Sequence, residues 1–397
     1  MATLKPRSTA DIEATIQDTA ARNESLEVVG MGSKRAIGRP SEATDVLDLA
    51  YIAGVESYEP EELVLSARAA TPVAEISEAL AARGQMLAFE PPDFSQLLGT
   101  GRGSIAGVFA SNLSGPRRIK AGAARDFILG FSGVNGRGES FRAGGRVVKN
   151  VTGYDLSKLM CGSWGTLAVM TQVTLKVLPA PETEVSVGIA GLSHELAVRA
   201  MSEALKSSAE VSGATYVPRP SAETGAPVSQ TVLRLEGIAA SVKARAEMLR
   251  GLLSTHGEIS QLDEQRSKHF WSGIRDAAPL ADLREDYVWR LSVPPTRSFQ
   301  VMADIAKAID VNYYCDWGGG LIWLAVAPHP EARADVIRSA LAPSGGHATL
   351  IRAPANVRRS VAVFEPQPQA LAELTRRVKL SFDPARVLSR SRMYEGM

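Results

Sequence analysis

The amino-acid sequence predicts an α+β fold that is divided between two domains. The chain has 397 residues, and single hydrophobic cores stop growing at roughly 250–300 residues. Segments with the period of strands and segments with the period of helices both occur along its whole length. Pro179 and Pro181 interrupt this pattern and separate a glycine-rich first part from a second part of different texture. We therefore expect one domain at residues 1–180 and a second at residues 181–397, ending in a helix.

The first domain is expected to begin with a helix and to be rich in strands. Ser8 and Asp11 have the spacing of a capping box, which marks a helix start. A second helix is expected between Thr71, which can cap it, and Gly84, which can end it. Strands are expected at residues 26–29, 62–69, 127–134, 139–141 and 167–177, the third and fourth forming a hairpin.

The second domain is expected to mix the two kinds of element. Helices are expected at residues 196–206, 239–253 and 369–382. Strands are expected at residues 231–236, 287–293 and 321–326. Residues 218–229 are expected to form a flexible loop.

Composition excludes several classes of protein. Lys plus Arg is 44 and Asp plus Glu is 43, so no global charge attracts nucleic acid or anionic lipid. No run of about 18 apolar residues and no signal-peptide core occurs, which favours a cytoplasmic protein that docks on the inner face of the membrane only through partners. Cys161 and Cys315 lack a C-x-x-C spacing, so an iron–sulfur cluster in this chain is not expected, and buried thiols are favoured over a disulfide.

Two glycine-rich loops carry the functional signal. The first, residues 30–35, directly follows an expected strand, and the second spans residues 99–107 and continues to Gly115. Glycines allow several backbone N–H groups to converge on a phosphate. Each loop alone is more often a simple turn, but two such loops in one domain favour a dinucleotide held between two lobes.

A Rossmann fold is not favoured. Residues 101–106 match G-x-G-x-x-A, but this pattern indicates NAD binding only between a strand and a helix. The preceding residues 90–94, with two prolines, make a poor strand. Neither loop has the spacing of an ATP-binding P-loop.

The glycine loops, together with the segment VVKNVTGYDLSKLMCGSWGTLAVMTQVTLKVLP at residues 147–179, resemble the PCMH-type FAD-binding domain of the vanillyl-alcohol oxidase family. Segments along nearly the whole chain, including RGQMLAFEPPDF, VWRLSVPPT and DWGGGLIWLAVAP, resemble the FAD-binding subunits of glycolate oxidase (glycolate dehydrogenase). Departures from the family pattern include Met31 for glycine, Trp164 for an acidic or small residue, and residues 388–393 for an N-P-G-R-M ending.

The resemblance implies a two-lobed flavin domain followed by a smaller, ferredoxin-like α+β cap domain. It also implies FAD as cofactor, held without a covalent bond, since none of the five histidines precedes residue 194. Carried over by position, the residues that contact FAD are Gly30, Met31, Gly32, Ser33, Lys34, Gly103, Ser104, Ala106, Gly107, Ser111, Ser114 and Val169.

Oxidation of a 2-hydroxy acid needs a cation for the carboxylate and a base for the hydroxyl proton, beside a hydride acceptor. Arg290 is the candidate cation, because a guanidinium binds a carboxylate with two hydrogen bonds, although an ordinary strand arginine is an equal alternative. His347 is the candidate base, against the commoner role of a structural or surface histidine. No pair of histidines has metal-ligand spacing, so no metal is expected.

Related hydroxy-acid dehydrogenases carry H-x-G-D-G-N-x-H, and here Asp316 and Trp323 stand at its two histidine places. The chain is therefore interpreted either as a subunit that oxidises glycolate to glyoxylate, or as a non-catalytic subunit for electron relay or assembly. A stand-alone FAD oxidase of another 2-hydroxy acid is a third interpretation. The resemblance implies as partners a second FAD-binding flavoprotein and an iron–sulfur subunit. Arg290, His347 and Asp316 grouped over the flavin would favour catalysis, and a face blocked by Trp317 or Trp323 would favour the non-catalytic role.

Overall fold

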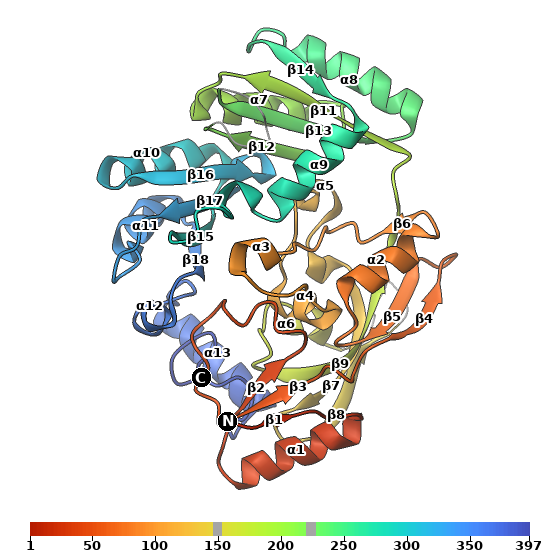
Figure 1. The fold of residues 1–397 in the computed structure, drawn as a ribbon, viewed down its shortest axis with the longest axis vertical. Coiled ribbons are helices and arrows are strands. Elements are labelled where there is room, and N and C mark those ends of the chain that lie inside the picture. Colours follow the sequence, from red (N-terminus) through yellow and green to blue (C-terminus); the bar gives the residue numbers. More distant parts are fainter. Residues whose placement is uncertain (146–152, 220–227) are drawn as a thin grey trace.

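The computed structural model describes residues 1–145, 153–219 and 228–397. Two sheets organise these residues, the first in the lower half of Figure 1 and the second in the upper half. The first sheet has five strands in the order β4-β5-β9-β7-β8, and the second has eight in the order β14-β11-β13-β12-β16-β17-β15-β18. Both helices and sheets contribute throughout, as an α+β fold requires.

The five-stranded sheet is antiparallel and belongs to the first part of the chain. Its strands are β4 (Val55–Glu59), β5 (Val64–Arg68), β7 (Ile128–Asn135), β8 (Ser140–Gly144) and β9 (Ala168–Lys176). Two small sheets adjoin it: β1 (Thr3–Leu4), β2 (Leu26–Val29) and β3 (Asp45–Asp48) pair in parallel, and β6 (Gln85–Met86) pairs with β10 (Leu178–Pro179). The helices here are α1 (Thr9–Ala21), α2 (Val73–Ala81), α3 (Ser95–Leu98), α4 (Ile105–Ser111), α5 (Arg118–Ala121) and α6 (Leu156–Met160).

The eight-stranded sheet is also antiparallel. Its strands are β11 (Thr183–Ala190), β12 (Gly213–Val217), β13 (Gln230–Gly237), β14 (Ile259–Leu262), β15 (Tyr287–Ser292), β16 (Val311–Asp316), β17 (Leu321–Val326) and β18 (His347–Arg352). The helices that follow or separate them are α7 (His194–Lys206), α8 (Ala239–Leu253), α9 (Glu264–Arg275), α10 (Ser298–Ala308), α11 (Ala334–Leu341), α12 (Ala355–Ser360) and α13 (Gln369–Phe382).

The two faces of the eight-stranded sheet have different neighbours. One face packs on α7, α8, α10 and α11 in a single apolar cluster, to which Trp289 and Leu291 of β15 belong. The other face packs on α9 and on apolar residues of the first part, among them Phe94 and Leu113. Because successive strand residues point to opposite faces, Val288 and Arg290 are directed toward the first part of the chain.

Most expected elements are confirmed, several with their bounds. The capping box of Ser8 and Asp11 is present, and β2, β17, α8 and α13 have the expected bounds. The expected cap at Thr71 is wrong. Pro72 is the N-cap of α2, and the Thr71 hydroxyl instead donates to the carbonyl of Arg68 at 2.7 Å. Most of the expected loop at residues 218–229, and residues 147–152 of the family motif, lie outside the described residues.

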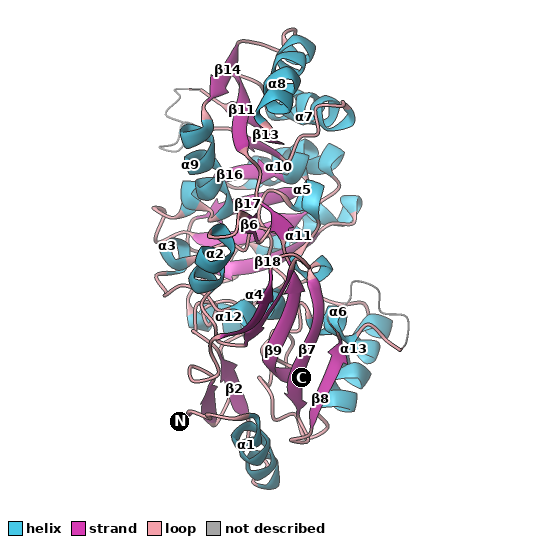
Figure 2. Cartoon of the chain, turned by 90° about the vertical axis from the view of Figure 1, so that its right-hand side faces the viewer, coloured by secondary structure: helices cyan, strands magenta, loops and turns pink. Residues whose placement is uncertain are grey.

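The C-terminal segment returns to the first sheet. Helix α13 lies beside β8 (Figure 2), where the rings of Phe382 and Phe141 are 6.0 Å apart. The Lys379 amine is buried and donates to the carbonyl of Thr166 at 2.7 Å and to Asp383 at 2.6 Å. The division of the chain at residue 180 stays a prediction, but the helix that it places in the second domain packs on the first.

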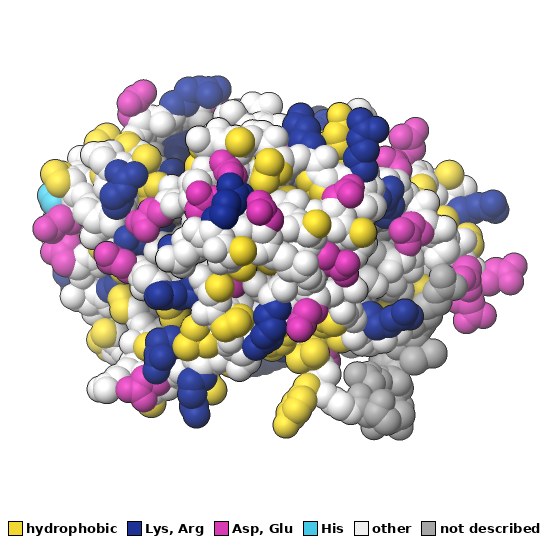
Figure 3. Space-filling model, turned by 90° about the horizontal axis from the view of Figure 1, so that it is seen from below, with side chains coloured by type: hydrophobic (Ala, Val, Ile, Leu, Met, Phe, Trp, Pro, Cys, Tyr) yellow, Lys and Arg dark blue, Asp and Glu magenta, His cyan; other side chains and the backbone are white. Residues whose placement is uncertain are grey.

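Charges are spread over the surface. On the face seen from below, basic and acidic side chains are interspersed (Figure 3), in line with 44 basic and 43 acidic residues in the sequence. Within the described ranges, no helix is long and apolar enough to cross a membrane. Cys161 and Cys315 are both free thiols; Cys315 is buried, as expected, whereas Cys161 is only half-buried.

Candidate cofactor and substrate site

The first glycine loop follows β2 and presents a set of free donors. In the part of the chain that the structure describes, the amides of Met31, Gly32, Ser33 and Lys34 donate to no protein acceptor. Gly32 has a φ of +74°, which favours glycine, whereas Met31 is not among the described residues with positive φ. The methionine in place of a family glycine therefore does not strain the loop.

The second loop closes on the first. Ser104 is the N-cap residue of α4, and the amides of Ile105 and Ala106 donate to the carbonyls of Thr71 and Ala69, which fixes this helix to the end of β5. A Cβ atom at Gly30 would lie 2.6 Å from the Ser104 hydroxyl oxygen. A larger residue at position 30 would therefore force the Ser104 side chain to move, which shows how closely the two loops approach each other.

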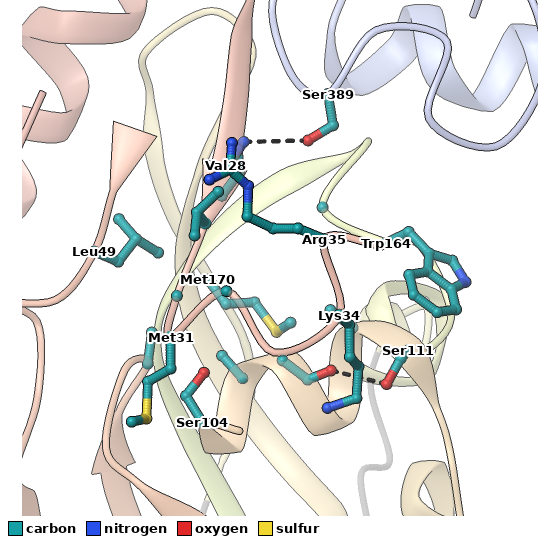
Figure 4. Close-up of a pocket in the computed structure, with 18 of the residues that line it drawn as sticks. Val28, Met31, Lys34, Arg35, Leu49, Ser104, Ser111, Trp164, Met170 and Ser389 are labelled. Atoms are coloured by element: carbon teal, nitrogen blue, oxygen red, sulfur yellow. Dashed lines mark hydrogen bonds between the residues drawn. The ribbon is translucent and has the colours of Figure 1, made fainter. Parts of the chain in front are cut away.

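A cavity of about 110 Å³ lies between these loops (Figure 4). Nine of the residues expected to contact FAD line it: Gly30, Met31, Gly32, Ser33, Lys34, Ser104, Ala106, Gly107 and Ser111. Leu49, Ala168, Met170, Trp164 and Arg392 line it as well.

Three expected contact residues lie outside the lining. Gly103 packs against the side chains of the first loop, and a Cβ atom at this position would be 3.0 Å from the Ser33 hydroxyl oxygen. The hydroxyl of buried Ser114 accepts a hydrogen bond from the Ala124 amide at 2.8 Å. Val169 is fully buried in the core, because β9 turns its neighbours Ala168 and Met170 toward the cavity.

Lys34 supplies a positive charge to this cavity. Figure 4 shows its side chain extending toward the helix that carries Ser104 and Ser111, while Arg35 turns away. Arg35 is paired with Glu27 at 2.6 Å, but Lys34 forms no ion pair with any described carboxylate. Desolvation lowers the pKa of Lys34 to about 8, opposed by the charge of Asp93. Free amides, a close glycine contact and an unpaired amine fit a diphosphate such as that of FAD.

Arg392 is a functional candidate that the sequence patterns did not single out. Its guanidinium donates to the carbonyl of Lys34 at 2.6 Å and to that of Arg35 at 3.3 Å, so the C-terminal segment holds the first loop in place. Its role could have been suspected from the sequence, because Arg392 aligns with the arginine of the family's N-P-G-R-M ending.

A second cavity, of about 330 Å³, adjoins the first and shares Ser111 and Trp164 with it. Strands β15 and β18 contribute the side chains that face the first part of the chain, namely Arg290, Ser292, His347, Thr349 and Ile351. The first part and the C-terminal segment complete the lining with Asn112, Leu113, Arg118, Gly162, Phe364, Glu365, Met393 and Tyr394.

The two candidate catalytic residues therefore line one cavity. Arg290 forms no ion pair with a described carboxylate, and its guanidinium carbon lies 5.0 Å from the centroid of the Trp317 ring. Desolvation, followed by the nearby charge of Arg118, lowers the pKa of Arg290 to about 10, so Arg290 stays charged at neutral pH.

His347 lies at the start of β18, where it lines the cavity and keeps part of its surface open to solvent, so that it is only partly desolvated. Desolvation and the charge of Arg290 lower its pKa below the ordinary value of 6.5, although Glu365 opposes this shift. The imidazole is therefore neutral at pH 7, the state in which it can accept a proton.

The segment in place of the histidine motif lies elsewhere. Asp316 is buried, and its carboxylate accepts the Trp317 amide at 2.7 Å. Burial raises the pKa of Asp316 to about 7. Trp323 packs edge-on against Phe94, with ring centroids 5.4 Å apart. Asp316, Trp317 and Trp323 line neither cavity, whereas Trp164 lines both.

Within residues 1–145, 153–219 and 228–397, no group of three or more His, Cys, Asp or Glu side chains could hold a metal ion.

Comparisons with known proteins identify the family of this chain. Residues 1–144 match the family model described as FAD binding domain. The chain is 34% identical over 374 residues to glycolate oxidase subunit GlcE of Escherichia coli (strain K12), an alignment that covers 93% of this chain and 92% of GlcE. It is 29% identical over 184 residues to glycolate oxidase subunit GlcD of Bacillus subtilis (strain 168), covering 46% of this chain and 38% of GlcD.

Solved structures share the fold at low sequence identity. p-Cresol methylhydroxylase with bound substrate gives a TM-score of 0.73 at 13% identity, covering 99% of this chain and 88% of that one. 4-Ethylphenol oxidase from Gulosibacter chungangensis, in complex with isoeugenol, gives a TM-score of 0.70 at 13% identity. This alignment covers 99% of this chain and 89% of that one. The expected α+β fold with a PCMH-type FAD-binding domain is confirmed. The chain belongs to the family of FAD-binding flavoprotein subunits that includes glycolate oxidase subunit GlcE.

Proposed function

We propose that this protein is the FAD-binding subunit of a glycolate oxidase (dehydrogenase) complex and takes part in oxidising glycolate to glyoxylate. FAD, held without a covalent bond, supplies the acceptor for the hydride when it is bound. The glycine loops and Lys34 hold the diphosphate, and the cavity lined by Arg290 and His347 holds the 2-hydroxy acid. The observation that carries this proposal is that the two cavities adjoin and share Ser111 and Trp164.

In this proposal each residue has one task. Arg290 binds the substrate carboxylate, because it is charged and has no described carboxylate partner. His347 accepts the hydroxyl proton on a ring nitrogen, because its lowered pKa keeps it neutral at pH 7. Leu113, Ile351 and Phe364 supply apolar walls that limit water around the reacting carbon.

A non-catalytic role in electron relay or assembly is the second candidate. It is favoured by the position of residues 316–323, none of which lines either cavity or offers it a proton-accepting side chain. In this case a sister flavoprotein performs the oxidation. An independent FAD oxidase of another 2-hydroxy acid is the third candidate.

The electrons must leave the subunit after each turnover. We infer that a second flavoprotein and an iron–sulfur subunit receive them, since the sequence lacks the cysteine spacing that a cluster needs. The complex would then lie in the cytoplasm, at the inner face of the membrane.

The test is anaerobic mixing of the FAD-loaded chain with glycolate while flavin absorbance is followed. Bleaching of the flavin supports oxidation by this subunit. Full FAD occupancy without bleaching, together with activity once the partner subunits are added, supports the non-catalytic role. Bleaching by other 2-hydroxy acids but not by glycolate supports the third candidate.

A further inference from the structure

A second arginine reaches the cavity of Arg290 from the other side of the domain interface. Arg118, the first residue of α5, lines this cavity, and its guanidinium carbon lies 4.3 Å from the centroid of the Trp317 ring. Arg290 lies 5.0 Å from the same centroid. The indole nitrogen of Trp317 donates to the carbonyl of Gly115 at 3.0 Å, so the ring has a fixed position between the domains. Cation–π contacts with one anchored ring thus position both guanidiniums.

Desolvation lowers the pKa of both arginines, and two carboxylates act on these charges only from beyond ion-pairing distance: Asp126 raises the pKa of Arg118 and Asp316 raises that of Arg290. Neither Arg118 nor Arg290 forms an ion pair with a carboxylate of the described chain, although partly buried charges are normally paired. Glu365 lines the same cavity, but it pairs with Arg338 at 3.5 Å and accepts the Ala348 amide at 2.9 Å. Two converging cations without a partner indicate that the cavity is built for an anion.

The preceding residue fixes the position of Arg118. The guanidinium of Arg117 pairs with Glu236 of the second sheet at 2.5 Å, and its amide donates to Glu90 at 2.5 Å. Glu90 in turn accepts from Arg234 at 2.8 Å and 3.0 Å. This buried network joins the domains directly beside Arg118, so its guanidinium enters the cavity in a defined place.

We propose that Arg118 binds the carboxylate of the substrate together with Arg290, so that the anion is held from both domains at once. This inference rests on the proposed function, because it assigns a second cation to the same 2-hydroxy-acid cavity. Arg118 forms no part of the loop cavity, so its contribution is to substrate binding and not to the diphosphate.

Oxalate is the probe, because this dicarboxylate has neither a C–H hydride nor an alcohol proton to give up and so cannot be oxidised in the same way. The full-length FAD-loaded chain is titrated with oxalate while the flavin absorbance change is recorded. Loss of a charged hydrogen-bonding partner should weaken oxalate binding by roughly 10- to 100-fold in Arg118→Gln, and by a similar factor in Arg290→Gln. Arg118→Lys, which keeps the charge but loses the fork, should fall between the glutamine variant and the unmodified protein.

Arg125→Gln is the matched control, because Arg125 is an exposed arginine seven residues further on that lies outside the cavity lining. It should change the dissociation constant by less than about twofold. An equal loss in Arg125→Gln would mean long-range attraction and would overturn the inference. Unchanged oxalate binding in Arg118→Gln would also overturn the inference, whether or not the flavin reduction potential shifts in that variant.

Failure of the two proposals can be told apart. If the unmodified protein binds FAD but gives no response to oxalate, the 2-hydroxy-acid cavity and the role of Arg118 both fail. If the unmodified protein responds and Arg118→Gln responds equally, only the role of Arg118 fails. Circular dichroism and flavin content show whether each variant is folded and holds FAD. If Arg118→Gln loses FAD, the test passes to Arg118→Lys. A folded Arg118→Lys that binds oxalate as tightly as the unmodified protein would then overturn the inference.

Discussion

At the scale of the residue, the charge states of a few desolvated groups decide what the cavities can bind. Lys34 and Arg290 lie in adjoining cavities, and desolvation lowers the pKa of each. Neither shift removes the positive charge at neutral pH, so both cavities attract anions. Arg35 is paired with Glu27, and the Arg392 guanidinium donates to backbone carbonyls of the first loop, whereas the Lys34 amine forms no ion pair with a described carboxylate.

Lys34 should make FAD binding depend on pH. Its pKa of about 8 without ligand means that the amine loses its proton as pH rises through 8, and the attraction for the diphosphate is lost in the same range. FAD affinity should therefore be highest below pH 8 and fall above it. Lys34→Met should bind FAD more weakly at pH 7, by roughly 10-fold, and show no such dependence.

Fluorescence titration of the FAD-free chain between pH 6 and 10 measures this effect. Lys158→Met is the control, because Lys158 is exposed and already paired with Asp155 at 3.0 Å. An equal slope in Lys34→Met and the unmodified chain would assign the pH dependence to another group.

His347 should appear as an acid limb in the rate of flavin reduction. The neutral imidazole is the proton acceptor, and its pKa lies below 6.5, so the rate should fall only as pH drops through that lowered value. His347→Gln should reduce the rate by roughly 10² to 10⁴-fold and abolish the limb. Stopped-flow reduction by glycolate across pH 4.5 to 8 tests this, and a limb that persists in the variant would place the base elsewhere.

At the scale of the element, the site depends on two short loops that each follow or precede a regular element. The first loop leaves β2, and the second is held by the pairing of the first α4 amides with carbonyls at the end of β5. Both loops are thereby fixed on secondary structure, which lets backbone donors keep their places without side-chain ligands.

Substitution of Gly32 in the first loop, or of Gly107 in the first turn of α4 beside the second loop, should abolish FAD binding and leave the second sheet folded. Gly32→Val places a β-branched side chain at a φ of +74°, and a Cβ atom at Gly107 would lie 3.3 Å from the Ser104 hydroxyl oxygen. Flavin content after gel filtration and circular dichroism measure the two effects. Gly101→Val is the control, since a Cβ atom there meets nothing within 4 Å; full flavin occupancy in Gly32→Val and Gly107→Val would remove the loops from the site.

At the scale of the whole molecule, a buried ion network connects the first part of the chain to the eight-stranded sheet. Arg117 and Glu90 come from the first part of the chain, Arg234 and Glu236 from the second sheet, and all four side chains are at most 12% exposed. Such a network contributes little when intact relative to apolar residues, but removing one member leaves unpaired buried charges.

Arg234→Met should therefore destabilise the protein by about 3–5 kcal/mol. The network should also govern acid stability. Arg234 is the main cation that lowers the pKa of Glu90 and brings that of Glu236 to about 2, each against the raising effect of burial. The stabilisation that the two carboxylates contribute is fully present above the glutamate pKa of about 4.3 in the unfolded chain. It is lost as the pH falls toward about 2.

Thermal unfolding between pH 2.5 and 7 measures both effects in the FAD-loaded chain. Arg234→Met should show a lower Tm at pH 7 and a weaker fall of Tm with acid. Arg199→Met, which removes an exposed arginine paired with Glu195, should change little. A Tm loss in Arg199→Met as large as in Arg234→Met would argue against a special role for the buried network.

The sequence by itself determined the features that depend on a few neighbouring residues. The capping box of Ser8, the strand before Gly30 and the positive φ of Gly32 are all set by local geometry, and so they could be predicted. The near balance of charge and the spacing of the cysteines likewise needed no structure.

Only the tertiary structure decided which distant residues meet. Arg118 and Arg290 are far apart in sequence, and they share a cavity because β15 turns Arg290 toward the first part of the chain while Trp317 is anchored on Gly115. Helix α13 packs on β8, and Arg392 holds the first loop, through contacts that span most of the chain. A periodic pattern shows that a strand has two faces, but which partner covers each face depends on how the domains pack, and no local window contains that information.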